Sequence, residues 1–118
     1  MSSEDPEITN ILKIRGERNA SEDKGESKIY VKKLARAILT VISKHGEARL
    51  KAVGAPSVNN AVKSFIIARS MAEPRGMELL CSAEFDVADF GGQEKTAIMF
   101  TVFPDEYEEE EEEEKEKE

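Results

Sequence analysis

The residues able to do covalent chemistry are few and widely separated in this chain. Its 118 residues include one histidine, His45, and one cysteine, Cys81. His45 precedes a glycine at an expected helix end, where a positive side chain suits the helix dipole. Cys81 alternates with apolar residues as in a buried strand, whereas a reactive thiolate needs exposure and positive neighbours. One cysteine and one histidine also argue against a zinc site. We therefore expect no enzyme, no metal and no cofactor.

Phosphate binding is the chemistry that the basic residues could perform. Four of them recur at helical spacing and form a basic stripe on one expected helix: Lys28, Lys32, Lys33 and Arg36. Such a stripe is most often a solvated helix surface, and contact with phosphates is the alternative. Further positive charge near the same elements comes from Arg49, Lys51 and Lys95.

A glycine turn between an expected strand and an expected helix is the second candidate for phosphate binding. Gly54 opens the sequence Gly-Ala-Pro-Ser, and the backbone N–H groups of a helix N-terminus attract anions. A tight strand-to-helix turn explains these residues equally well, because the glycine patterns of nucleotide sites are absent. Ser57 is placed to cap the helix by accepting a backbone N–H. Asn59, Asn60 and Lys63 follow and can donate to a phosphate or a base edge.

Charge divides the chain into three parts. Residues 105–118 contain 11 acidic residues and two lysines, a net charge of −9. Residues 8–104 contain 11 acidic and 15 basic residues, a net charge of +4, and residues 1–7 are acidic and polar. We therefore expect a disordered acidic lead over 1–7, one domain over 8–104 and a disordered poly-Glu tail over 105–118. The basic domain reopens nucleic-acid binding, which the overall charge of −8 would disfavour.

Location follows from the same composition. No apolar run approaches the roughly 20 residues that span a bilayer, so we expect no membrane partner. A single cysteine fits a reducing compartment, and we expect a cytoplasmic or nuclear protein.

Hydrophobic periodicity alternates between that of strands and that of helices along the domain. We expect a helix from Ser27 to a stop at Gly46, and a second from Ser57 to a break at 74–76. The expected strands cover 8–15, 49–53, 77–87 and 95–103, with loops over 16–26 and 88–94. This β-α-β-α-β-β order predicts an α+β two-layer sandwich, with a four-stranded mixed sheet and both helices on one face.

The second helix is apolar over more of its circumference than one sheet contact requires. Its apolar residues include Val58, Val62, Phe65 and Ile66. A helix of this kind usually packs on a second surface, and another subunit is our expectation.

Several short blocks, in the correct order over residues 49–104, resemble the stage V sporulation protein S family. They are Ala52–Ala55 (AVGA), Val58–Lys63 (VNNAVK), Ile67–Arg69 (IAR), Pro74–Gly76 (PRG), Leu79–Cys81 (LLC) and Glu94–Ile98 (EKTAI). That family is similar in turn to the Alba chromatin and RNA-binding proteins, which share the sandwich predicted above. The resemblance implies dimers that bind nucleic acid. By position it implies contacts from Lys24 and Lys28, from Gly54 to Lys63, and from the hairpin arm Phe90–Lys95.

These observations lead to one functional hypothesis and one alternative. We expect an Alba-like domain, a homodimer or higher oligomer, that contacts phosphates of RNA or DNA through positioned basic residues. The acidic tail is expected to compete in cis for the basic surface and to modulate binding. The alternative is a protein-interaction or regulatory module with protein partners and no nucleic acid. A patch of basic residues clustered on one face would favour the first hypothesis, and basic residues that are scattered and paired with acids would favour the second.

Overall fold

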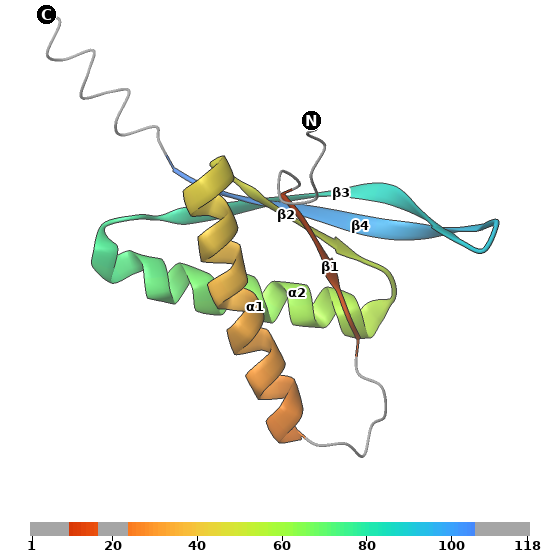
Figure 1. The fold of residues 1–118 in the computed structure, drawn as a ribbon, viewed down its shortest axis with the longest axis horizontal. Coiled ribbons are helices and arrows are strands. Elements are labelled where there is room, and N and C mark those ends of the chain that lie inside the picture. The colour runs from red at the N-terminus through yellow and green to blue at the C-terminus, as the bar shows by residue number, and fades with distance from the viewer. Residues whose placement is uncertain (1–9, 17–23, 106–118) are drawn as a thin grey trace, which may run out of the picture.

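The fold is a two-layer α+β sandwich, seen here in a computed structural model that describes residues 10–16 and 24–105. Figure 1 shows both helices on one side of a four-stranded sheet, as predicted. The expected lead, most of the tail and part of the first loop lie outside the described residues. The elements are β1 (Ile11–Ile14), α1 (Lys24–His45), β2 (Ala48–Ala52), α2 (Ala55–Ala72), the 3₁₀ turn η2 (Glu73–Arg75), β3 (Leu79–Phe90) and β4 (Gln93–Pro104).

The sheet is mixed, with the strand order β1-β2-β4-β3. β1 pairs with β2 in parallel, while β4 pairs antiparallel with both β2 and β3. The register places Leu50 opposite Phe100 and Ala48 opposite Val102, so these side chains share one face. They are buried against the helices, and β1 and β3 form the two edges of the sheet.

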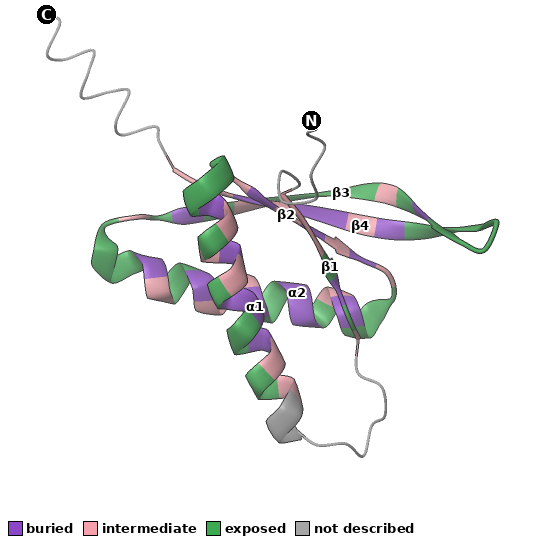
Figure 2. Cartoon of the chain, in the orientation of Figure 1, coloured by how far each residue is buried: buried purple, intermediate pink, exposed green. Residues whose placement is uncertain are grey.

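The core lies between the helices and this face of the sheet. Leu34, Ile38 and Ile42 are spaced four residues apart on α1 and are all buried, which confirms the periodicity predicted for this helix. They pack in one cluster with Leu50 and Leu79 from the sheet. Figure 2 shows buried segments on both helices and along the middle of the sheet, whereas the outer part of β3 and β4 is exposed. None of the helices within the described ranges is both long and apolar enough to cross a membrane.

The predicted end of α1 is confirmed, whereas both helices begin earlier than predicted. Gly46 closes α1 as expected, with φ at 88° and its N–H donating to the Ile42 carbonyl over 2.8 Å. The start predicted at Ser27 was wrong, because α1 begins at Lys24, in a stretch without apolar residues to mark the boundary. α2 also begins earlier than predicted, at Ala55, with Gly54 in the N-cap position at φ 91°.

The hairpin between β3 and β4 is longer than predicted. The loop expected over 88–94 is instead a two-residue turn at Gly91 and Gly92, with φ of 61° and 86°. Two successive residues with positive φ match the right-handed twist of the strands, so pairing continues from Phe90 to Gln93. The Asp89 carboxylate also accepts the Gly92 N–H over 3.0 Å. The result is an arm that extends past the helices (Figure 1).

Candidate nucleic-acid interface

The basic stripe on α1 is an exposed ladder. Lys28, Lys32 and Arg36 are four residues apart, so each lies roughly 6 Å from the next on the same side of the helix. All three are exposed, as is Lys33 beside them. Lys24 begins the helix, but its side chain lies outside the described residues. The ladder ends at Lys44 in the last turn, with Thr40 in between.

The turn at the start of α2 uses its serine differently from the prediction. Ser57 does not cap the helix: its hydroxyl donates to the Val53 carbonyl at 2.7 Å and lies 3.0 Å from the Gly54 carbonyl. The residue is 2% exposed, because α2 begins two residues earlier and places Ser57 within its first turn. Gly16 also lies against this turn, since a Cβ on Gly16 would be 2.9 Å from the Cβ of Pro56. The chain itself therefore covers part of this helix N-terminus.

The two neighbouring asparagines have different environments. Asn60 is 2% exposed, and its amide donates to the Arg15 carbonyl over 2.9 Å, which ties the end of β1 to α2. Asn59 and Lys63 are exposed on the same helix. Of the residues predicted on these turns, Asn59 and Lys63 are therefore available to a ligand, whereas Asn60 and Ser57 have structural partners.

Arg15 is a further basic residue of this region, and no motif in the sequence marks it. The Arg15 guanidinium lies 4.2 Å from the centroid of the Tyr30 ring, and the Arg15 backbone N–H donates to the Tyr30 hydroxyl over 2.8 Å. These contacts join the end of β1 to α1 and hold an exposed cation in place. The sequence carried no signal for this role, because the approach of Arg15 and Gly16 to the helices is visible only in the folded chain.

The arm presents a cation and an aromatic ring together. The Lys95 ammonium lies 5.4 Å from the centroid of the Phe90 ring, and both residues are exposed. Phe85, earlier in β3, is 80% exposed, although alternation along the strand puts it on the same face as the buried Leu79. The position of β3 at the edge of the sheet explains the exposure: Ile98, opposite Phe85 on β4, packs against the core, whereas Phe85 itself lies outside the core cluster.

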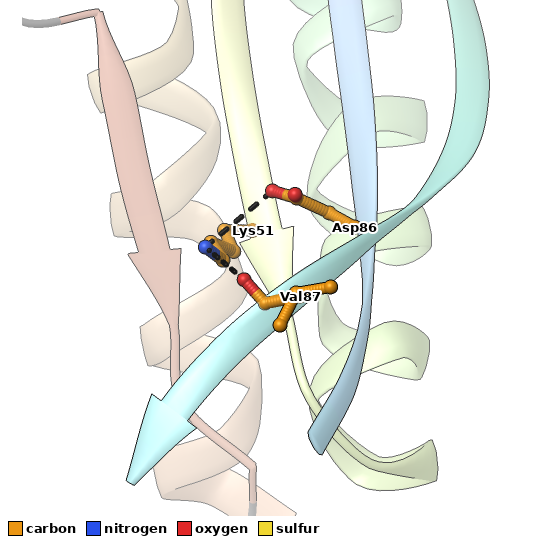
Figure 3. A network of polar contacts seen from close by, with 3 residues as sticks. All are labelled: Lys51, Asp86 and Val87. Atoms are coloured by element: carbon orange, nitrogen blue, oxygen red, sulfur yellow. Dashed lines mark hydrogen bonds and ion pairs between the residues drawn. The ribbon is translucent and has the colours of Figure 1, made fainter. Parts of the chain in front are cut away.

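Lys51 is held in an internal contact. Its ammonium donates to the Val87 carbonyl at 2.8 Å and lies 3.4 Å from the Asp86 carboxylate (Figure 3). The pKa of Asp86 lies below its ordinary value, mainly because the Val87 backbone N–H donates to the carboxylate. The hydrogen bond and the positive charge of Lys51 lower this pKa further. Figure 3 shows β3 passing in front of β2 here, on the side away from the helices. We call this contact the Lys51 pin, because it joins β2 to the base of the arm.

Neither single nucleophile shows signs of activation. Cys81 is half-buried, and burial raises the pKa of its thiol, which disfavours the thiolate. His45 is exposed at the end of α1. Across residues 10–16 and 24–105, no three His, Cys, Asp or Glu side chains gather as a metal site would require.

The candidate residues thus form three groups on three elements. Lys28 and Lys32 lie on α1, Asn59 and Lys63 on α2, and Lys95 on the arm. No hydrogen bond or ion pair between described residues joins one group to another. In the folded chain these residues are exposed and their lysines have no acidic partners in the described part of the fold, which suits electrostatic contact with a polyanion.

The fold and the comparison with known families agree. The β-α-β-α-β-β order, the four-stranded mixed sheet and the two helices on one face define an Alba-like sandwich. A family model for stage V sporulation protein S (SpoVS) matches residues 24–105, which include all of α1 through β4. The chain therefore belongs to the SpoVS family, as the short sequence blocks indicated.

Proposed function

We propose that this protein binds nucleic acid, RNA or DNA, through phosphate contacts. The observation that carries the proposal is that the candidate lysines are exposed and, within residues 10–16 and 24–105, form no ion pair with a carboxylate. Lys28, Lys32, Lys63 and Lys95 are exposed. In the described part of the chain, the two ion pairs are Lys51–Asp86 and Arg69–Glu78, so none of these four lysines is neutralised by a carboxylate. Unpaired lysines in a chain with more acidic than basic residues favour a polyanionic partner.

Each group has a distinct contribution. Lys28 and Lys32 supply phosphate contacts along α1, and Lys63 extends them to α2. On the arm, Phe90 offers a ring on which a base can stack while Lys95 neutralises a phosphate. This function needs no catalytic group or cofactor, and we place it in the cytoplasm or the nucleus.

A homodimer is the second part of the proposal. Large apolar side chains are exposed on α2, at Val62 (40%) and Ile66 (54%), and on β3, at Phe85 (80%) and Val87 (53%). Phe85 and Val87 point to the helix side of the sheet, and β3 is an edge strand. A second copy of the chain would cover these residues with the same residues of its own, in a two-fold interface. The third part of the proposal is that the acidic tail modulates the binding of nucleic acid.

Binding is tested with the full chain across a salt series, using fluorescently labelled duplex DNA, single-stranded DNA and RNA. We expect log affinity to fall linearly with log salt. In Lys28→Ala/Lys32→Ala, the slope should decrease by about 0.9 per lost contact on duplex and about 0.7 on single strands. The control is Arg69→Ala, since Arg69 is already paired with Glu78, and it should leave the slope unchanged. Absence of binding to all three at low salt would refute the proposal and direct the search to protein partners.

The dimer is tested separately by sedimentation. Phe85→Ser should shift the protein toward monomer, because Phe85 is the most exposed large apolar side chain among the residues that the structure describes. Phe90→Ser is the matched control: Phe90 is also exposed, at 50%, but it lies at the tip of the arm. A wild-type protein that sediments as a monomer, or equal effects of the two substitutions, would contradict the proposed interface.

A further inference from the structure

A basic groove lies between the C-terminal ends of α1 and α2, and Arg36 and Lys44 of the ladder are among the residues that line it. It has a volume of about 430 Å³, within the usual range of ligand pockets, and is open to solvent. Its polar lining consists of Arg36, Thr40, Ser43 and Lys44 from α1 and Arg75 from η2. Leu39 and Met71 form its apolar part. The groove was not visible in the sequence, because Arg75 is distant from the α1 residues along the chain.

The groove is suited to an anionic ligand. It is lined by three cations and two hydroxyls, with no carboxylate. In the described ranges, Arg36, Lys44 and Arg75 take part in no ion pair, and all three are exposed. The C-terminal end of α1 carries the negative end of the helix dipole, which favours cations and does not attract an anion. Affinity must therefore come from these side chains.

The acidic tail starts beside this groove. The Asp105 N–H donates to the Glu78 carbonyl over 2.8 Å, and Pro104 pairs with Leu79. Glu78 follows Arg75 by three residues, through the turn that closes η2. The root of the tail is thus anchored next to the segment that supplies Arg75. Figure 1 agrees, because β4 ends at the same end of the molecule as the last turn of α1 and the start of β3.

We propose that the acidic tail, residues 105–118, docks in this groove. The tail carries 11 acidic residues and two lysines, which complements the three cations. The 13 residues beyond Asp105 span at most about 45 Å when extended, enough to enter a groove beside their root. Covalent attachment gives the tail an effective concentration in the millimolar range, so individually weak carboxylate contacts suffice.

The docked tail would also reach part of the proposed nucleic-acid surface. Arg36 lines the groove and is the third member of the ladder on α1. Lys28 lies two turns before it, a distance of about 12 Å along the helix axis. The tail would therefore compete with phosphates at the α1 ladder but not at the arm. This consequence rests on the proposed function, whereas docking itself does not.

Docking is tested in the full chain without nucleic acid. A spin label is attached at Glu112→Cys in a Cys81→Ala background, and paramagnetic broadening of backbone amide signals is measured by NMR. At low salt we expect strong broadening at residues 43–46 and 75–77. It should disappear at about 1 M salt, where charges are screened beyond roughly 3 Å. The unlabelled spectrum checks that the variant remains folded.

Charge reversal identifies the surface. Lys44→Glu/Arg75→Glu should abolish the broadening, whereas Lys63→Glu/Lys95→Glu, with the same change of net charge, should leave it in place. Broadening at residues 59–63 or at the arm instead would overturn the inference, because the tail would then occupy the nucleic-acid surface directly. Absence of broadening throughout would overturn it too, and neither result would bear on whether the protein binds nucleic acid.

Discussion

Asn60 provides the sharpest test of how the structure assigns roles to neighbouring residues. The sequence presents Asn59 and Asn60 as equal candidates for a phosphate or base contact. In the structure, Asn60 is 2% exposed and its amide donates to the Arg15 carbonyl over 2.9 Å, whereas Asn59 is exposed. We therefore expect Asn60→Ala to act on stability and Asn59→Ala to act on binding.

The magnitude follows from the single hydrogen bond and the burial of its donor. Removing a buried partner costs about 1–2 kcal/mol, counting the lost bond and the poorer solvation of the acceptor. For a domain of this size, that cost corresponds to a fall in Tm of roughly 5–15 °C. Asn59→Ala should change the free energy of unfolding by no more than about 0.5 kcal/mol, as expected for an exposed residue without partners.

Both variants are measured by urea and thermal unfolding, followed by circular dichroism, and then for RNA and DNA affinity under folded conditions. We expect Asn60→Ala to lower the urea midpoint with an unchanged m-value, and to bind as the wild type does once folded. The reasoning is refuted if Asn60→Ala keeps the wild-type midpoint but loses affinity, because Asn60 would then face the ligand.

Two further predictions concern Gly16, which follows β1, and the contact between Lys51 and Asp86 at the base of the arm. Gly16→Ala should destabilise the protein by about 1–3 kcal/mol in urea unfolding, because its Cβ would lie 2.9 Å from the Cβ of Pro56; an unchanged midpoint would show that the loop shifts freely. The Lys51 pin should respond to pH through Asp86, whose folded pKa is lowered, so the contact is present above the ordinary pKa of 3.8 and is lost as pH falls through the lower folded value. An NMR titration should show the Asp86 and Val87 amides changing below pH 3.8, and Lys51→Met should raise the folded pKa toward that value; a midpoint at or above 3.8 in the wild type would contradict the pin.

Part of the candidate site was evident before the structure, and part was not. Lys28 and Lys32 could be placed on a helix surface because helical spacing alone puts them opposite the buried residues. Ser57 and Asn60 could not be separated from Asn59, since burial on α2 depends on the approach of Gly16 and Arg15 from β1. Lys51 looked like free positive charge, yet the crossing of β3 over β2 brings Asp86 to it.

The sequence by itself determined the elements, their order and the fold class. Leu34, Ile38 and Ile42 mark a helix with one buried side, and alternating apolar residues mark the strands, because backbone geometry sets these periods locally. Short blocks such as AVGA and VNNAVK were enough to indicate the family. These properties depend on neighbours along the chain, which the sequence displays directly.

The tertiary structure alone decided which parts of each face are covered. Alternation assigns Leu79 and Phe85 to the same side of β3, but Leu79 is fully buried and Phe85 is 80% exposed, because β3 is an edge strand and the core cluster includes Leu79 but does not extend to Phe85. The same holds for the groove, where Arg75 meets Arg36 and Lys44 only because α1 and α2 pack together. Coverage and proximity depend on segments distant in sequence, and local periodicity contains no information about them.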